Sequence, residues 1–173
     1  MITKSERKAA QQLAAEMIRQ SGIVILDQEV GGIEVVDFGL SNLAKEGVQV
    51  LTLVQTDTIS VKVLALFPNQ TEPEHWHPPV GDDPGKEETI RVISGTVYFY
   101  IEGEDNFSEG FLLDGKERCY TMRHEIVMKP GDQLLAFERP LFGPPDVADQ
   151  QQSAQGGQDR RCDDGDTPAH GGL

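Results

Sequence analysis

Two histidines and one glutamate in the middle of the chain have the residue types and the spacing of metal ligands. His75 and His77 are two positions apart, and six residues separate the later Glu88 from Gly95. On a β-strand, both imidazoles would point to the same face, because side chains alternate between the two faces. A turn glycine beyond Glu88 would let its carboxylate sit near the start of a neighbouring strand. Two imidazoles and a carboxylate suit first-row divalent metals and leave positions open for water or substrate. The spacing therefore predicts a metal site.

The residues alone leave other interpretations open. A His-x-His pair without a further signal is also typical of surface histidines, and the later Glu88 is what favours a metal. The same ligand set occurs in non-haem iron oxygenases. Glu74 and Glu87 are expected to be solvated loop acids, with Glu74 a second candidate for supporting a ligand or transferring a proton. His124 is expected to be a structural or pocket-lining residue.

The N-terminal segment, residues 1–22, has the pattern of a helix. Thr3 followed by Glu6 resembles a capping box. Apolar residues then recur at helical spacing up to Gly22: Ala10, Leu13, Ala14, Met17 and Ile18. We expect this helix to pack against the main domain as a lid or a dimer element.

From residue 23 the hydrophobic period changes to two. Runs of β-branched and aromatic residues, broken by turn residues, predict strands at 33–38, 48–57, 60–67, 91–102 and 124–129. Residues 129–132 read as a tight turn that closes one strand and opens another. Short strands without intervening helices indicate an antiparallel sandwich or barrel rather than βαβ units.

The last part of the chain differs in composition. Residues 143–173 hold five Gln, six Asp and six Gly, with only Val147 and Leu173 as larger aliphatic residues. Such a segment buries too little apolar surface to offset the entropy of ordering it, so a disordered acidic tail is expected. The expected organisation is an N-terminal helix (1–22), a β-domain (23–142) and this tail.

Composition excludes several functions. The 173 residues carry a formal charge of −14, which argues against a nucleic-acid or anionic-membrane surface. No apolar run approaches the roughly 18 residues that span a bilayer, and no secretory signal pattern opens the sequence. Two cysteines are too few for a disulfide framework and favour the cytoplasm. We expect an acidic protein that acts on a small molecule.

The motif around the two histidines resembles the first conserved motif of the cupin barrels. The enlarged loop at 78–87, the Pro-Pro after the histidines and the Lys-x-Glu-Thr before the glycine are similar to the bacterial D-lyxose isomerase family of cupins. Further similarity in kind and order lies at 37–40, 66–68, 97–103 and 120–126, within a resemblance that covers about residues 18–135. The resemblance implies an all-β fold, a cupin-type antiparallel β-barrel (jelly roll) with an N-terminal helix.

The resemblance also implies an activity. His75, His77 and Glu88 would bind Mn²⁺, with other divalent ions possible, and Lys86 would contact the sugar and orient it. The reaction would interconvert an aldose and a ketose, of the D-lyxose/D-xylulose or D-mannose/D-fructose type. A divalent metal would act as Lewis acid and template while negative charge builds on the sugar oxygens. The proton-transfer base is not assigned.

The second cupin motif, which normally supplies a fourth histidine, has no match here. Counted from Gly131, its Pro, Gly and His positions fall on Phe137, Arg139 and Phe142, and the only later histidine is His170. The altered end indicates either a changed reading frame or a truncated homologue. It keeps open a non-catalytic metal- or sugar-binding protein beside the isomerase. An incomplete barrel would leave strand edges unpaired, and a homodimer is therefore possible.

Overall fold

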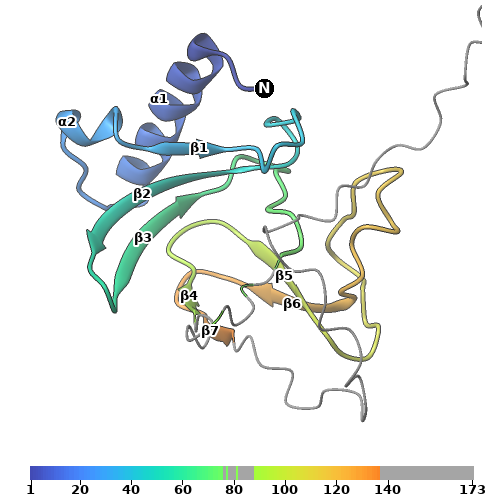
Figure 1. The fold of residues 1–173 in the computed structure, drawn as a ribbon. Coiled ribbons are helices and arrows are strands. Elements are labelled where there is room, and N and C mark those ends of the chain that lie inside the picture. The colour runs from blue at the N-terminus through green and yellow to red at the C-terminus, as the bar shows by residue number, and fades with distance from the viewer. Residues whose placement is uncertain (76, 78–80, 82–87, 137–173) are drawn as a thin grey trace, which may run out of the picture.

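The structure is a computed structural model that describes residues 1–75, 77, 81 and 88–136 (Figure 1). The described elements, in chain order, are α1 (Lys4–Gln20), α2 (Asp27–Val30), β1 (Glu34–Val36), β2 (Val48–Gln55), β3 (Ser60–Ala65), β4 (Glu88–Arg91), β5 (Val97–Ile101), β6 (His124–Met128) and β7 (Gln133–Ala136).

The predicted capping box starts α1. The backbone N–H of Glu6 donates to Thr3 Oγ1 at 3.2 Å, and the Glu6 carboxylate accepts from the Thr3 N–H at 2.8 Å. These two bonds satisfy donors that a helix start otherwise leaves without partners. The helix ends before Gly22, whose φ of +87° a residue with a Cβ rarely adopts. The expected N-terminal helix is confirmed.

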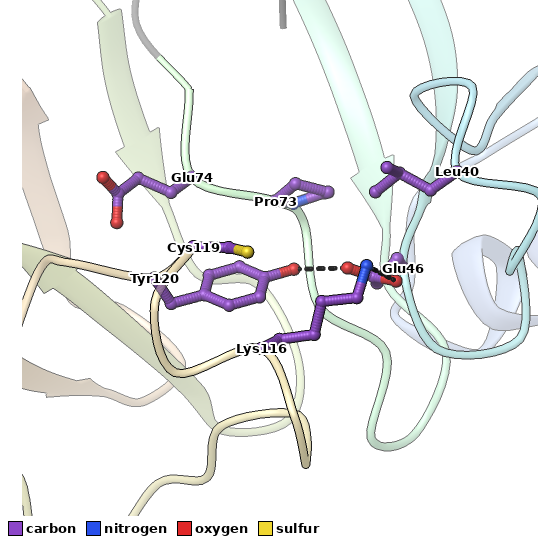
Figure 2. Close-up of a pocket in the computed structure, with 7 residues that line it drawn as sticks. All are labelled: Leu40, Glu46, Pro73, Glu74, Lys116, Cys119 and Tyr120. Carbon is purple, nitrogen blue, oxygen red and sulfur yellow. Dashed lines mark hydrogen bonds and ion pairs between the residues drawn. The ribbon is translucent and has the colours of Figure 1, made fainter. Parts of the chain in front are cut away.

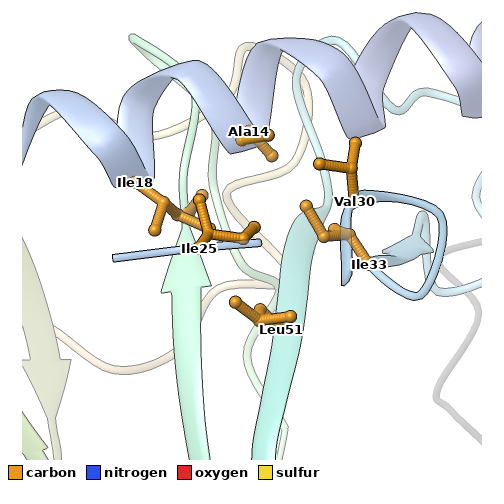
Figure 3. Packing of buried hydrophobic residues seen from close by; sticks show 8 residues of the cluster. Ala14, Ile18, Ile25, Val30, Ile33 and Leu51 are labelled. Atoms are coloured by element: carbon orange, nitrogen blue, oxygen red, sulfur yellow. The ribbon is translucent and has the colours of Figure 1, made fainter. Parts of the chain in front are cut away.

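The first sheet has the antiparallel order β1-β2-β3, and α1 lies across one of its faces (Figure 1). Buried residues of the helix and its following loop meet residues of the sheet: Ala14, Ala15, Ile18, Ile25, Val30, Ile33, Leu51 and Ala65 (Figure 3). Leu51 and Ala65 lie two register positions apart on neighbouring strands, so they share the face beneath the helix. This cluster confirms that the helix packs against the β-domain.

Two further antiparallel pairs follow. β4 pairs with β7, with Glu88 opposite Ala136, and β5 pairs with β6, with Ile101 opposite His124. The predicted tight turn at 129–132 joins β6 to β7. In it the Asp132 N–H donates to the Lys129 carbonyl at 2.9 Å, and Gly131 has a φ of +100°. The turn and the strand that follows it were both expected.

One predicted strand is wrong in its extent. Residues 91–102 do not form a single strand, because the chain turns at Gly95, where φ is +80°. β4 ends at Arg91 and β5 starts at Val97, and the two strands pair with different partners. Glycine adopts this left-handed conformation without steric cost. A continuous apolar run therefore became two strands in separate sheets.

The β-rich architecture with an N-terminal helix agrees with the expected fold class. Within the described ranges the strands form three separate sheets and no closed barrel, so the jelly roll itself is not confirmed. Of the expected β-domain, residues 137–142 lie outside the described residues, and so does the whole expected tail at 143–173. None of the helices in the described part is long and apolar enough to cross a membrane.

Candidate active site

The segment that carries the two histidines runs beside the end of the β1–β2 connection. Residues 46 and 71 form a parallel bridge, in which the Gly47 N–H donates to the Thr71 carbonyl at 2.9 Å and the Thr71 N–H donates to the Lys45 carbonyl at 2.7 Å. A Cβ at Gly47 would lie 2.6 Å from the Val36 carbonyl oxygen, so only glycine allows this close approach. The bridge fixes the backbone four residues before His75.

His75 is held by its backbone neighbour and by an aromatic ring. Its Nδ1 lies 2.8 Å from the Pro73 carbonyl oxygen. Because a carbonyl only accepts, this contact places the proton on Nδ1 and leaves the lone pair on Nε2. The ring of Phe38 stacks on the imidazole at 6.0 Å between centroids and 30° between planes. Phe38 itself has a φ of +53°, a conformation unusual for a bulky residue.

His77 and Glu88 approach one another although ten residues separate them in the sequence. The Nε2 atom of His77 lies 3.7 Å from Oε1 of Glu88, and the rings of His75 and His77 meet edge to face at 5.2 Å between centroids. Glu88 is the first residue of β4, so its expected place at a strand start is confirmed. The side chains of His75, His77 and Glu88 are 34%, 37% and 32% exposed, which leaves them accessible to a molecule from solvent.

The histidines do not lie on a strand, contrary to the expectation. Residues 72–75 and 77 have no regular secondary structure, so the edge-to-face contact of the two rings does not result from strand alternation. The proline at 73 has no N–H to donate to a sheet, which disfavours a strand at that position. The two rings nevertheless lie in contact, as the spacing predicted.

A divalent cation fits the donor chemistry of this group. Donors of this kind lie about 2.0–2.2 Å from the ion, so two ligands of one ion are at most roughly 4.4 Å apart. The 3.7 Å between His77 Nε2 and Glu88 Oε1 lies within that limit. Among the residues described, no three His, Cys, Asp or Glu side chains converge as a complete cation site. The structure therefore brings His77 and Glu88 together as a pair, with His75 against the His77 ring.

A second carboxylate, which the sequence analysis did not single out, lies next to His75. Oε1 of Glu72 is 3.9 Å from Nε2 of His75, and the Glu72 side chain is 28% exposed. Its negative charge adds to that of Glu88 and favours a cation near the imidazoles. Phe38 was also missed as a site residue. The sequence pointed to the segment of Phe38 only through the family resemblance at residues 37–40. Stacking between Phe38 and His75 leaves no local sequence pattern, because the two residues are far apart in the chain.

The other predicted residues have different outcomes. Lys86 and Glu87 lie outside the described residues, so their roles stay predictions. His124 starts β6, and its Nδ1 lies 2.9 Å from the Glu104 carbonyl oxygen. Glu74 is not a merely solvated acid, because its carboxylate accepts hydrogen bonds from the Thr121 N–H, from Thr121 Oγ1 at 2.7 Å and from the Met122 N–H at 3.1 Å.

A small cavity lies between the β1–β2 connection, which contributes Leu40 and Glu46, and the segment that holds Lys116 and Tyr120, and Pro73 and Glu74 also line it (Figure 2). Its volume is about 50 Å³, which is below the roughly 300–1,000 Å³ of small-molecule sites. It has room for one or two water molecules. Its floor holds the buried Glu46 carboxylate, which accepts from the Tyr120 hydroxyl at 2.8 Å. This cavity is therefore not a sugar site.

Comparison with known proteins identifies the class of enzyme. The chain is 49% identical over 130 residues to a D-lyxose ketol-isomerase of Cohnella laeviribosi, which covers 75% of this chain and 71% of the relative. It is 45% identical over 134 residues to a D-lyxose/D-mannose isomerase of Thermosediminibacter oceani, covering 77% and 74% of the two chains. A D-lyxose ketol-isomerase of a Thermofilum species is 40% identical over 134 residues, with the same coverage.

These relatives are sugar isomerases, so the predicted class, an aldose–ketose isomerase, is confirmed. At this identity and coverage, the chain belongs to the D-lyxose ketol-isomerase family. No family model matches the chain, and the cupin assignment therefore stays a prediction.

Proposed function

We propose that this protein interconverts an aldose and a ketose of the D-lyxose/D-xylulose or D-mannose/D-fructose type, with Mn²⁺ or a similar divalent ion held by His75, His77 and Glu88. The observation that carries the proposal is the 40–49% identity to three isomerases with these names. The 3.7 Å approach of His77 to Glu88 supports the ligand set. We also propose that the chain folds as a cupin-type barrel.

The residues of the site have distinct parts in this reaction. His75, His77 and Glu88 would hold a divalent ion, which would supply Lewis acidity to the sugar. The hydrogen bond from His75 Nδ1 to Pro73 fixes the tautomer that leaves Nε2 able to bind a cation. The ammonium of Lys86 would orient the sugar and stabilise the negative charge that develops on its oxygens. The exposed third of the His75, His77 and Glu88 side chains would be the face that receives the sugar.

An aldose panel assayed with added Mn²⁺ tests the activity and the roles together. The wild-type chain is expected to convert D-lyxose or D-mannose to the ketose, and His75→Ala is expected to lose this conversion. Gln12→Ala is the control, because Gln12 is an exposed residue of α1, and it should keep the wild-type rate. Equal turnover by the wild type and His75→Ala would remove the proposed role of His75. A wild-type chain that converts no aldose in the panel would contradict the proposed isomerase activity.

A second candidate is a binding protein without turnover. It is favoured by the absence of the second cupin motif from positions 137, 139 and 142. Calorimetric titration separates the two functions. Binding of Mn²⁺ and sugar without product in the aldose panel would select the binding protein. An iron-dependent oxygenase, the remaining alternative, would consume oxygen with Fe²⁺ and show no isomerisation with Mn²⁺.

A further inference from the structure

Glu74, the residue directly before His75, binds a distant part of the chain. Its two carboxylate oxygens accept three hydrogen bonds, from the backbone N–H and the hydroxyl of Thr121 and from the N–H of Met122. These donors belong to the segment that leads into β6, which starts at His124. Hydrogen bonds to an ionised carboxylate are stronger than those between neutral groups. The histidine segment is thus tied to the start of β6.

The segment that leads into β6 has a second set of contacts, which it makes with Glu46 in the β1–β2 connection. Glu46 is 2% exposed, and its carboxylate accepts from the Tyr120 hydroxyl at 2.8 Å and lies 3.4 Å from Nζ of Lys116. The Asn42 amide donates to Oε2 of Glu46 at 3.2 Å. Figure 2 shows Tyr120 and Lys116 pointing toward Glu46, with Pro73 and Glu74 along the edge of the same cavity. Burying a carboxylate without hydrogen-bond partners costs free energy, so these contacts stabilise the buried Glu46 side chain.

The contacts of Glu46 and of Glu74 involve neighbouring parts of the chain at both ends. The Glu46–Thr71 bridge holds the backbone that leads to Glu74, while Tyr120 and Thr121 are adjacent in the chain. The segment 71–74 is therefore held at Thr71 by the backbone of residues 45 and 47, and at Glu74 by residues 121 and 122. Burial raises the pKa of the Tyr120 phenol, and its hydrogen bond to Glu46 raises it further. The phenol thus remains a donor at neutral pH.

We propose that Glu74 is a positioning residue of the metal site, which fixes the backbone before His75 so that the His75 and His77 imidazoles meet Glu88. This inference rests on the proposed function, because it gives Glu74 a role through the two proposed ligands. Glu74 touches neither the metal nor the sugar in this role. Its contribution is that the imidazoles are held in place before the cation arrives, so binding does not have to order them.

Calorimetric titration of the full chain with Mn²⁺ tests the inference. Replacing groups that orient metal ligands typically weakens metal affinity 10- to 100-fold, and we expect Glu74→Gln to weaken Mn²⁺ binding by about tenfold or more. Thr121→Val removes only the hydroxyl donor, so the Mn²⁺ affinity of this variant should lie between those of the wild type and Glu74→Gln. Glu34→Gln is the matched control, since Glu34 is an exposed acid on β1, and it should bind like the wild type.

The outcomes distinguish this inference from the proposed function. Circular dichroism and thermal unfolding without Mn²⁺ establish that each variant is folded, so that a weaker titration reports the site and not lost protein. If Glu74→Gln is folded and binds Mn²⁺ with wild-type affinity, the positioning role is overturned while the metal site stands. If Glu74→Gln does not fold, Thr121→Val decides, and unchanged affinity in that variant overturns the role. A wild type that fails to bind Mn²⁺ instead contradicts the metal site on which the inference depends.

Discussion

The Nε2 atom of His77 lies 3.7 Å from Oε1 of Glu88, although ten residues separate the two in the sequence. One side chain comes from an irregular segment after β3 and the other from the first residue of β4. The distance is close enough for both atoms to bind one divalent ion, since each would lie about 2.0–2.2 Å from it. Among the three proposed ligands, His77 and Glu88 are thus the two whose ligating atoms the fold brings within reach of one ion.

Glu88→Gln tests this pair. The change keeps the shape of the side chain but removes the negative charge and a strong oxygen ligand, so Mn²⁺ affinity should fall by roughly tenfold or more. The measurement is the manganese electron paramagnetic resonance signal of free ion during titration. Glu16→Gln, an exposed position on α1, serves as control. Unchanged affinity in Glu88→Gln would exclude its carboxylate as a ligand.

Gln49 gives a prediction about stability. Its side chain is fully buried on the face of β2 that packs beneath α1, and neither its amide nitrogen nor its amide oxygen has a hydrogen-bond partner among the described residues. A buried polar group without a partner costs about 1–3 kcal/mol. Gln49→Met should therefore raise the free energy of unfolding by about 1 kcal/mol.

Urea unfolding followed by circular dichroism measures this gain. Gln20→Met, at the exposed end of α1, should change the stability by no more than about 0.5 kcal/mol. A loss of stability in Gln49→Met would mean that the amide finds partners in solution.

The lowered pKa of the Glu125 carboxyl predicts how the stability changes at acidic pH. Burial alone would raise the pKa of this carboxyl, but hydrogen bonds from the Glu109 and Gly110 N–H groups, both at 2.8 Å, and from Ser108 hold the pKa below the ordinary 4.5. The unfolded chain then takes up the proton first on acidification. The stabilising contribution is complete above about pH 4.5 and is lost as the pH falls through the lowered value.

The corresponding variant is Glu125→Gln. It should be less stable than the wild type at neutral pH, and its stability should depend less on pH below about 4.5. Urea titrations at a series of pH values measure both effects. Parallel pH profiles for the two proteins would contradict the role assigned to this carboxylate.

The environment of Tyr120 predicts how the stability changes at alkaline pH. Burial first, and then the hydrogen bond to Glu46, raise the pKa of its phenol above the ordinary 10.0. As the pH rises above about 10, the unfolded chain loses the phenolic proton while the folded chain keeps it, so the folded state loses stability. Tyr120→Phe should show a smaller alkaline loss, read from thermal unfolding at increasing pH. Some loss should persist, because burial also raises the pKa of Tyr100. An unchanged alkaline profile in Tyr120→Phe would contradict this account.

Local chemistry in the sequence determined much of this protein. The capping box at Thr3 and the turn at residues 129–132 were both predictable, because caps and turns depend on near neighbours in the chain. The His-x-His spacing with a later glutamate was likewise enough to name candidate ligands, and the further motifs around it indicated, by resemblance, the enzyme family that the comparisons confirm.

Tertiary structure decided which distant residues surround those ligands. Phe38 stacks on His75, Tyr120 donates to the buried Glu46, and Glu74 binds Thr121. Each of these contacts joins segments that are far apart in the chain, and its energy depends on burial and on the exact approach of two backbones. A local sequence pattern contains neither quantity, so these partners emerge only when the chain has folded.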